Sequence, residues 1–276
     1  MKTGQNQRVL ILGAARQGLA LARYLSSQGA KVTLNDSRSA EQLQPAMQEM
    51  QAYSVQWQVG GHSLELLDQA DLVCISGGVP LTLPLVVEAQ RRGIPLSNDS
   101  QIFMDAVPCP VIGITGSAGK TTTTTLVGRI AKAAAPAGQQ VWVGGNIGLP
   151  LIDHLSEIRL GDLVVLELSS FQLELMTCSP HIGAVLNITP NHLDRHGTLE
   201  AYTAAKAHIL TAQTEQDIAV LGLEDPGAWG LAPLVRGRLV TFSFRQPPAG
   251  QAGTFFEDKV YHLSDGRQTT PILPAE

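Results

Sequence analysis

The chain has 276 residues, of which 44% are hydrophobic and only 16% are charged. That length and composition allow a sizeable core and predict a globular protein of about two domains. Because 19 Lys and Arg are set against 24 Asp and Glu, for a net charge of −5, the sequence excludes an extended basic surface for nucleic acid.

Cysteine spacing and the N-terminal sequence bear on the cellular compartment. Cys74, Cys109 and Cys178 are odd in number, far apart and in apolar surroundings, which predicts reduced, buried thiols rather than a disulfide framework or a zinc site. The apolar run near the N-terminus is too short for a signal peptide, and no stretch approaches the ~20 apolar residues of a membrane span. We therefore expect a cytoplasmic protein with neither a membrane nor a nucleic acid as partner.

Short apolar runs alternate with helical patterns over residues 1–100. The runs "RVLILG", "KVTLND" and "ADLVCISGG" are typical of buried parallel strands, and "GLALARYLSSQG" has helical periodicity. This alternation indicates βαβ units, so we expect an α/β fold with a Rossmann-like domain over residues 1–107. The Pro-rich joint "DAVPCPVIGITG" puts the boundary near Pro108, and a second domain is expected over residues 108–276.

The turn after the first strand resembles a dinucleotide fingerprint. "LGAARQG", residues 12–18, together with Asp36 at the end of the second strand, approaches the motif G-x-G-x-x-G followed by an acidic residue. Ala15 replaces the middle glycine, where the backbone must let a pyrophosphate approach, and this weakens the interpretation as an NAD site. Asp36, Ser37 and Arg38 offer an acceptor, a hydroxyl and a cation to another nucleotide, with an ordinary turn as the alternative.

Strand "VIGIT" runs into a glycine-rich loop and then a helix from Lys120. Successive backbone N–H groups at a helix N-terminus favour an anion, a lysine reaches the terminal phosphates, and the next hydroxyl ligates magnesium, a role that Thr121 fits. The strict pattern G-x-x-x-x-G-K-[ST] fails because Ile114 stands five positions before Gly119, so the loop is a variant. The expected phosphate-binding residues are Gly116, Ser117, Ala118, Gly119, Lys120, Thr121 and Thr122.

Five consecutive threonines follow this lysine. Thr121 and Thr122 are placed to face the nucleotide. We expect the hydroxyls of residues 123–125 to bond back to carbonyls one turn earlier and to help pack the helix on the sheet. An ordinary turn with a surface lysine is the alternative for the whole stretch.

Two later strands bring polar side chains to a sheet edge. "LVVLE" ends in Glu167, which should emerge at the carboxyl edge of a parallel sheet as a magnesium ligand, unless it caps the next helix. "AVLNIT" runs into "PNHLDRHG", which puts His192, Asp194 and His196 on a loop at the same edge if both strands run parallel. Solvated loop histidines are the alternative there.

A helix follows, and one of its lysines is unusual. Thr198 can cap this helix, with Glu200 in the first turn. At helical spacing Lys206 shares a face with Tyr202 and with apolar residues. A lysine in such a stripe must snorkel to water, meet a carboxylate or lose its charge, and the residues alone favour snorkelling.

Four separated motifs together resemble the Mur ligase family. They are "GITGSAGKTTTTTLVG", "VGGNIGLP", "LELSSFQLE" and "NITPNHLDRHGTLEAYTAAKAHIL", in the family's order and spacing. The resemblance covers nearly the whole chain, and "ELSSFQLE" is similar to the branch that adds D-glutamate. It implies a Rossmann-like N-terminal domain followed by a P-loop ATPase-type central domain with a mostly parallel sheet.

The resemblance implies ATP-dependent amide bond synthesis in peptidoglycan assembly. ATP would phosphorylate the L-alanyl carboxylate of UDP-N-acetylmuramoyl-L-alanine, the amine of D-glutamate would attack the acyl phosphate, and phosphate would leave. Such chemistry is mostly positioning and charge neutralisation. The implied cofactors are ATP and Mg²⁺, the implied partners are these small molecules, and a monomer is expected.

Site residues carry over from the family's motifs position by position. Lys120 and Thr121 would hold the phosphates and a first magnesium, and Glu167 and His192 would hold a second. Lys206 matches the family's carbamylated lysine, in which CO₂ turns an ill-placed cation into an anion that serves the metal site. Lys120, Glu167, His192 and Lys206 are thus the implied catalytic residues. The implied substrate-binding residues are Arg16, Gln17, Asp36, Ser37, Arg38, Gly78, Asn146 and His192.

The sequence departs from the family near its C-terminal end. Beyond Val240 the alternation gives way to Gly and Pro turns that predict short hairpins. The chain stops before the family's "GxHNxxN" stretch and its third, amino-acid-binding domain. We therefore expect that domain to be absent and do not expect complete turnover by this chain alone.

Other functions compete with the ligase. A non-catalytic UDP-sugar-binding module fits the missing C-terminal motifs. A nicotinamide-dependent oxidoreductase is supported by residues 12–18 alone and leaves the second domain unexplained. A folate-specific ligase of the same fold is opposed by residues 1–107, because folylpolyglutamate synthases lack a UDP-binding first domain of this type.

Overall fold

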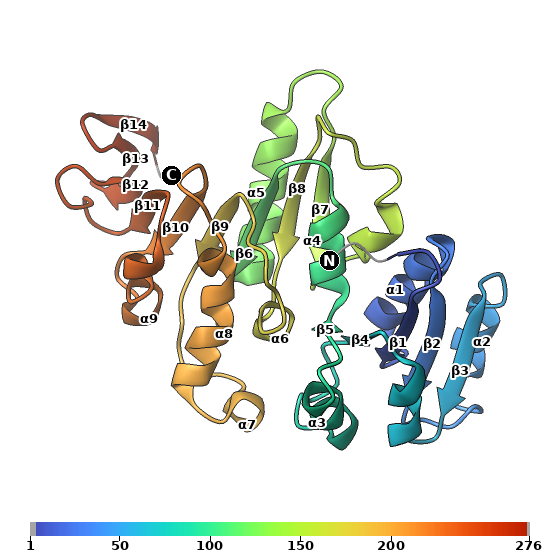
Figure 1. The fold of residues 1–276 in the computed structure, drawn as a ribbon. Coiled ribbons are helices and arrows are strands. Elements are labelled where there is room, and N and C mark those ends of the chain that lie inside the picture. The colour runs from blue at the N-terminus through green and yellow to red at the C-terminus, as the bar shows by residue number, and fades with distance from the viewer. Residues whose placement is uncertain (1–3, 275–276) are drawn as a thin grey trace. The chain divides into compact units, whose positions relative to one another are not determined.

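The computed structural model describes residues 4–274, which fall into two compact units (Figure 1). The first unit contains the chain up to Pro108 together with Leu149–Ile158, and the second unit contains the rest. The expected α/β class is confirmed. The second domain expected over residues 108–276 is not continuous, because a segment within it belongs to the first unit.

A five-stranded parallel sheet forms the centre of the first unit, in the order β3-β2-β1-β4-β5. The strand order reverses between β1 and β4, the point at which open parallel sheets bind ligands outside their carboxyl ends. The strands are β1 Arg8–Leu12, β2 Lys31–Asp36, β3 Val55–Val59, β4 Leu72–Ile75 and β5 Leu96–Ser97. The helices are α1 Arg16–Ser27, α2 Gln44–Glu49, α3 Pro84–Arg91 and α4 Asp99–Ala106, with 3₁₀ turns η1 Leu64–Gln69 and η2 Leu151–His154.

The central strands of this unit are apolar on both faces, as β1 and β4 show by their almost complete burial. The turn from β1 into α1 depends on Gly18. A Cβ atom at this position would lie 1.9 Å from the carbonyl oxygen of Gly13. Glycine is therefore required for α1 to begin this close to the strand.

An ion pair attaches the segment Leu149–Ile158 to α1. Arg23 donates to both carboxylate oxygens of Asp153, at 3.0 and 2.7 Å, and its side chain is only 19% exposed. Leu151 and Ile152 of the same segment are buried. Two-point, partly desolvated pairs of this kind are stronger than single surface contacts, so this pair helps to hold the segment in the first unit.

A nine-stranded sheet forms the second unit, in the order β14-β13-β12-β11-β10-β9-β6-β8-β7. It is parallel from β7 to β12, and β13 and β14 are antiparallel additions. The strands are β6 Val111–Thr115, β7 Val141–Gly145, β8 Leu163–Glu167, β9 Ile182–Val185, β10 Ile218–Gly222, β11 Arg238–Ser243, β12 Ala252–Glu257, β13 Val260–Asp265 and β14 Thr269–Pro274. The helices are α5 Lys120–Ala134, α6 Ser170–Leu173, α7 Leu193–His196, α8 Leu199–Thr211 and α9 Pro226–Trp229, with the 3₁₀ turn η3 Ala232–Leu234.

The hairpins expected beyond Val240 are confirmed for β12, β13 and β14, which are dark red in Figure 1. Regular alternation nevertheless continues past Val240 itself, because that residue lies within β11 and pairs with Val220 of β10. The sequence did not predict β11 because the apolar run around Val240 is short and gives only a weak strand signal. Such a strand can be identified only when its neighbour β10 is known.

Helices α5 and α8 place the chemistry of the second unit. Helix α5 packs on β6, β7 and β8, and α8 packs on β6 and β9. Ile114, Val141, Val165 and Ala184 form a core cluster within this sheet, with further apolar side chains packed against it. The sheet is thus rigid where β6, β8 and β9 end side by side.

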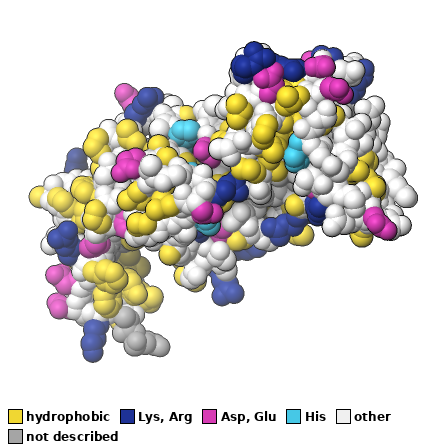
Figure 2. Space-filling view, turned by 90° about the horizontal axis from the view of Figure 1, so that it is seen from below, with side chains coloured by type: hydrophobic (Ala, Val, Ile, Leu, Met, Phe, Trp, Pro, Cys, Tyr) yellow, Lys and Arg dark blue, Asp and Glu magenta, His cyan; other side chains and the backbone are white. Residues whose placement is uncertain are grey.

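Charged side chains, helix lengths and cysteines are the structural features that relate to the composition. On the face drawn in Figure 2, basic side chains lie among acidic and apolar ones rather than in one continuous area. No helix of residues 4–274 combines the length and the apolar character needed to cross a bilayer. Cys74 and Cys109 are buried and Cys178 is half-buried, with no disulfide among them.

Candidate functional site

The glycine-rich loop lies between β6 and α5, as expected. Gly119 precedes the helix with φ +81°, a left-handed conformation that glycine adopts without strain. Asn187, two residues after β9, makes two hydrogen bonds to the loop. Its Oδ1 accepts the Ala118 N–H at 2.9 Å, and its Nδ2 donates to the Ala118 carbonyl at 3.1 Å. The first turn of α5 therefore presents its backbone N–H groups from a loop of defined shape.

Two lysine side chains converge on one carbonyl of this loop. The Nζ atoms of Lys120 and Lys206 each lie 3.0 Å from the oxygen of Gly116. Lys120 also lies 3.4 Å from the Ser117 carbonyl. Two cations near the same atom repel each other, and an anion beside the loop would relieve that repulsion. The arrangement suits a polyphosphate.

Lys206 is buried rather than snorkelling, so the favoured interpretation of this residue from the sequence is wrong. It is 1% exposed, donates to Thr115 Oγ1 at 3.2 Å, and lies 4.6 Å from the centroid of the Tyr202 ring. Burial, followed by the positive charge of Lys120, lowers the pKa of Lys206 to about 7. A large fraction of this amine is therefore uncharged, and nucleophilic, near neutral pH.

A buried carboxylate, that of Glu167, contacts the first turn of α5, which follows the glycine-rich loop. Glu167 ends β8 and is 1% exposed; Thr121 Oγ1 donates to its Oε2 at 2.8 Å and Asn146 Nδ2 donates to its Oε1 at 3.0 Å. In the described part of the chain no Lys, Arg or His forms an ion pair with it. A buried carboxylate without a cation is costly, and Thr and Glu oxygens are ligands that Mg²⁺ accepts alongside water and phosphate. The alternative role as a helix cap is wrong, because Ser169 caps α6.

Asp194 and His196 lie on α7, a single helical turn, and His192 directly precedes it, so this segment is not an open loop. The rings of His192 and His196 both contact Phe171, each with ring centroids 5.2 Å apart. His192 meets Phe171 edge-on, and His196 stacks on it with an interplanar angle of 2°. No cluster of at least three His, Cys, Asp or Glu side chains suited to a metal occurs within residues 4–274. The role of His192 as a metal ligand stays a prediction.

His196 is held on more than one side. Its Nε2 lies 3.0 Å from Ser170 Oγ, and its ring is 5.2 Å from that of Tyr202. Burial comes first among the causes that lower the pKa of His196, followed by the charges of Lys206, Arg195 and His192. Partial burial between Phe171 and Tyr202 therefore favours the neutral imidazole.

The five threonines of α5 make contacts that differ in part from those expected. Thr121 bonds Glu167, and Thr125 Oγ1 donates to the Thr121 carbonyl at 2.8 Å, as expected for a bond one turn back. Thr124 is fully buried, yet its hydroxyl has no hydrogen-bond partner among residues 4–274. Of residues 123–125, only Thr125 shows the expected bond in the described chain. Thr124 serves packing instead, and Thr122 is exposed.

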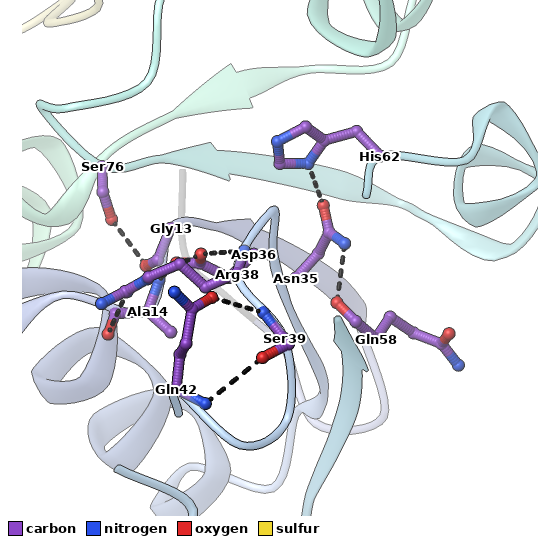
Figure 3. A network of polar contacts seen from close by, with 10 residues as sticks. All are labelled: Gly13, Ala14, Asn35, Asp36, Arg38, Ser39, Gln42, Gln58, His62 and Ser76. Carbon is purple, nitrogen blue, oxygen red and sulfur yellow. Dashed lines mark hydrogen bonds and ion pairs between the residues drawn. The ribbon is translucent and has the colours of Figure 1, made fainter. Parts of the chain in front are cut away.

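In the first unit, Asp36 holds the loop after β1 (Figure 3). Its Oδ2 accepts the Ala14 N–H at 2.8 Å, and Arg38 donates to both carboxylate oxygens, at 2.9 and 2.8 Å. Arg38 Nη2 also lies 3.2 Å from the Ala14 carbonyl. Hydrogen bonds from Arg38 are the first cause of the strongly lowered pKa of Asp36. Asp36 is thus engaged within the protein, where the sequence suggested an acceptor for a ligand.

A second network at this edge involves residues that the sequence did not single out (Figure 3). Asn35 is fully buried and donates to the carbonyls of Gln58 and Gly61, each at 2.7 Å. Because both amide hydrogens are used, its Oδ1 faces His62 Nδ1 as an acceptor, so that nitrogen carries a proton. The network fixes the loop after β3 to the end of β2, where Asn35 lies.

The other predicted substrate contacts of the first unit also lie at its carboxyl edge. Arg16 and Gln17 begin α1 after β1, Ser37 follows β2, and Gly78 follows β4. Arg16 and Ser37 are exposed. The fold therefore gathers these residues at one edge of one sheet. No contact of theirs identifies a ligand, and their roles stay predictions.

Sequence reasoning missed several residues around the glycine-rich loop. Asn187 lies two residues after β9, close to the strand end, and a position at a strand end is also what singled out Glu167 in β8. Tyr202 was noticed only as a neighbour of Lys206, yet its hydroxyl lies 3.2 Å from Ser117 Oγ. Phe171 stands within the motif "LELSSFQLE" but was given no role of its own, because a lone aromatic residue in a short helix is normally core.

Family models match both units. The model described as "Mur ligase MurD-like, N-terminal domain" matches residues 7–98, and the model described as "Mur ligase middle domain" matches residues 114–271, more than half of the chain. The chain belongs to the Mur ligase family. This confirms the resemblance carried by the four sequence motifs.

Relatives agree with this membership. A UDP-N-acetylmuramoylalanine–D-glutamate ligase of Symbiobacterium thermophilum is 44% identical over 97% of this chain and 58% of its own length. One of Pelotomaculum thermopropionicum is 42% identical over 89% of this chain and 54% of its own. The solved structure of a UDP-N-acetylmuramate:L-alanyl-gamma-D-glutamyl-meso-diaminopimelate ligase from Neisseria meningitides has a TM-score of 0.57 at 16% identity, covers 95% of this chain and 85% of that one, and supports the Mur ligase fold. The chain spans less than three fifths of the length of the first two ligases.

Proposed function

We propose that this Mur ligase chain supplies the UDP-sugar- and ATP-binding parts of a ligase that joins D-glutamate to UDP-N-acetylmuramoyl-L-alanine. The γ-phosphoryl group of ATP goes to the L-alanyl carboxylate, the amine of D-glutamate attacks the acyl phosphate, and phosphate leaves. The proposal is supported by the matched family models and by relatives named for this activity. Its setting is the cytoplasm, with the chain acting as a monomer.

The observation that carries the proposal is the convergence of Lys120 and Lys206 on the Gly116 carbonyl. A phosphate chain at the N-terminus of α5 would accept hydrogen bonds from the loop N–H groups and from Lys120, which would turn from the carbonyl to the phosphate. Transfer of a phosphoryl group needs charge neutralisation more than covalent chemistry from the protein. A positively charged loop with fixed N–H donors supplies that neutralisation.

Thr121 and Glu167 are the residues proposed to hold Mg²⁺. Their side-chain oxygens already lie 2.8 Å apart, and the buried carboxylate has no cationic partner in the described chain. When bound, the ion would neutralise charge on the phosphates and on the carboxylate together. Asn146 orients Glu167 by donating to its other oxygen.

Carbamylation of Lys206 is the second part of the proposal. CO₂ adds to an uncharged amine, and the lowered pKa of Lys206 provides that form near neutral pH. The N–C bond forms from the amine lone pair, a proton leaves to solvent, and the product carries one negative charge. That charge would lie beside Lys120 and the loop, where the free cation is repelled.

In the first unit, the proposed role of Asp36 is to position the loop for the UDP moiety rather than to contact it. The carboxylate is already occupied by Ala14 and Arg38, so it has little capacity left for a ribose hydroxyl. Together with Ala15 in place of glycine, this argues against the nicotinamide cofactor of the competing oxidoreductase hypothesis. Arg16, Gln17, Ser37 and Gly78 are the proposed direct contacts.

Calorimetric titration of the chain tests the proposal. UDP-N-acetylmuramoyl-L-alanine and MgATP should each bind saturably, and NADH should not. Lys120→Ala should weaken ATP binding and leave the UDP-sugar isotherm unchanged, whereas Arg38→Ala should weaken only the UDP-sugar. Binding of NADH without the UDP-sugar would overturn the assignment of the first unit. Binding of the UDP-sugar without ATP would favour a non-catalytic UDP-sugar-binding module.

A labelling experiment tests the carbamate. With ¹³C-bicarbonate, a carbamate carbonyl signal should appear in the ¹³C spectrum near neutral pH and should be missing from Lys206→Met. Lys132→Met, a change at an exposed lysine of α5, serves as the control. A spectrum that is the same for the parent chain and Lys206→Met would remove the carbamate from the mechanism.

A further inference from the structure

A series of rings connects α6, α7 and α8. Phe171, His196 and Tyr202 follow one another with ring centroids 5.2 Å apart at each step. His196 is the middle member: it lies flat against Phe171 and is tilted by 60° against Tyr202. The series ends at Lys206, whose Nζ lies 4.6 Å from the Tyr202 centroid.

The far end of the series reaches the glycine-rich loop. Tyr202 is 1% exposed, and its hydroxyl lies 3.2 Å from Ser117 Oγ. Ser117 Oγ donates to the Thr189 carbonyl at 3.0 Å and accepts from the Thr189 N–H at 2.9 Å. The one hydroxyl hydrogen of Ser117 is thus used, so Tyr202 is the donor to the loop.

The backbone around His196 is unusually constrained for a surface turn. Helix α7 has one residue with positive φ at each end, His192 at +52° and Gly197 at +78°. A non-glycine residue in this region persists only when its surroundings hold it. Ser170 Oγ, at 3.0 Å from His196 Nε2, adds a polar contact from α6. The imidazole is therefore contacted from three sides, by Phe171, Ser170 and Tyr202.

We propose that His196 is a positioning residue for the glycine-rich loop. Its ring fixes the orientation of Tyr202, and Tyr202 then holds the loop at Ser117 and lies beneath the Lys206 amine. Without the ring, Tyr202 can tilt into the space left behind, which loosens the loop and displaces the amine. His196 itself touches neither phosphate nor metal in this role. The effect on nucleotide affinity depends on the proposed function, whereas the effect on the loop does not.

Three variants separate the ring from its polar contact. His196→Ala removes the ring, His196→Phe keeps a flat ring without the bond to Ser170, and Ser170→Ala removes that bond while keeping the imidazole. An aromatic contact contributes enough for about a fivefold to tenfold change in an equilibrium constant. For His196→Ala, we expect the hydrogen-exchange rates of the amides of residues 116–119 to rise by about fivefold to tenfold. His196→Phe and Ser170→Ala should both stay near the parent chain.

Two further measurements exclude a purely structural effect. Amides of β10 in the same protein should keep their protection in His196→Ala, which a general loss of stability would not allow. The Cε protons of Lys206, shielded by the Tyr202 ring face, should move downfield in His196→Ala and stay in His196→Phe, with Lys206→Met used for assignment. Mant-ATP affinity should fall about fivefold to tenfold for His196→Ala alone.

The outcomes decide the question separately from the proposed function. Unchanged loop exchange and an unchanged Lys206 shift in His196→Ala would overturn the positioning role. Equal effects in His196→Ala and His196→Phe would also overturn it, because the ring would then not matter. If the parent chain binds no mant-ATP, the proposed function fails, while exchange and the Lys206 shift still decide the role of His196.

Discussion

Two loops of this molecule have the same position in their sheets and opposite electrostatics. One follows β1 and leads into α1; the other follows β6 and leads into α5. In the first loop, Asp36 and Arg38 form an ion pair, so their charges cancel, and both side chains also hydrogen-bond to the backbone of Ala14. In the second, the neutral amide of Asn187 holds the backbone of Ala118, and no described ion pair cancels the charge of Lys120.

The difference separates shape from charge in a strand–loop–helix turn. An internal ion pair makes the first loop rigid without attracting an anion, so it suits recognition by hydrogen bonds and shape. The second loop gains its shape from an amide, and the cation of Lys120 remains available to a phosphate. A family that binds both a UDP-sugar and ATP would use one loop of each kind.

The largest effect is expected in the first loop, for Gly18→Ala. The new Cβ would meet the Gly13 carbonyl oxygen at 1.9 Å and Ser76 Oγ at 2.8 Å, and neither can move freely. The free energy of unfolding of the first unit should fall by about 4 kcal/mol. Gly77→Ala is the control, since its Cβ would contact only Gln17 Oε1, at 3.8 Å, within residues 4–274. Equal losses in both variants, measured by urea unfolding, would mean that α1 is not held so closely.

In the second loop, Lys206→Met should stabilise the chain in a pH-dependent way. The folded-state pKa of Lys206 is lowered from 10.5 to about 7, so the unfolded chain binds more protons between these values and stability rises with pH in that window. Lys206→Met removes the penalty, which is on the order of 3 kcal/mol at pH 8 and vanishes above pH ~10.5. Urea unfolding in CO₂-free buffer across this range measures the difference; a difference that does not change with pH would contradict it.

Lys120→Ala tests the uncancelled charge directly. Loss of a charged hydrogen bond to phosphate should weaken MgATP binding by about thirtyfold, corresponding to ~2 kcal/mol. Lys132→Ala removes the same charge from the last turn of the same helix and should leave the affinity close to that of the parent chain. If the two variants weaken binding equally, general attraction rather than the loop accounts for the affinity.

Asp36→Asn tests the cancelled charge of the first loop. The variant loses a buried carboxylate that accepts from Ala14 and Arg38, at a cost of about 1 kcal/mol at pH 7. Because the pKa of Asp36 is lowered on folding, its contribution is present above the unfolded value of ~3.9 and is lost as the pH falls below it. Thermal unfolding at pH 7 and pH 3 should therefore show a smaller difference at pH 3. Asp71→Asn, at the exposed pair with Arg8, should change little.

The smallest effect is expected for Gly119→Ala in the second loop. Its φ of +81° strains any residue with a Cβ, but the nearest atom to that Cβ, Leu186 Cδ1, is 3.7 Å away. Strain without a clash should cost about 1 kcal/mol, well below the Gly18→Ala cost. Reversal of the two costs in urea unfolding would mean that conformation rather than close approach makes these loops need glycine.

Local patterns account for most of the fold and part of the site. Buried apolar runs predicted β1, β2, β4, β6, β8 and β9, and Thr198 caps α8 as expected, with its side chain accepting the Ala201 N–H at 3.1 Å. Glu167 lies at the carboxyl edge of the sheet because the four apolar residues before it form the strand β8, which ends at Glu167. These features are contained in neighbouring residues, so no knowledge of distant partners was needed.

The sequence by itself determined the strand–loop–helix order, the glycine-rich loop and the family. Only the tertiary structure decided that Leu149–Ile158 joins the first unit, that Lys206 is buried beneath the loop, and that His196 stands between two rings. The physical reason is common to all three. Burial and pairing depend on which elements meet, and Arg23 and Asp153, 130 positions apart, carry no local sign that they will form an ion pair.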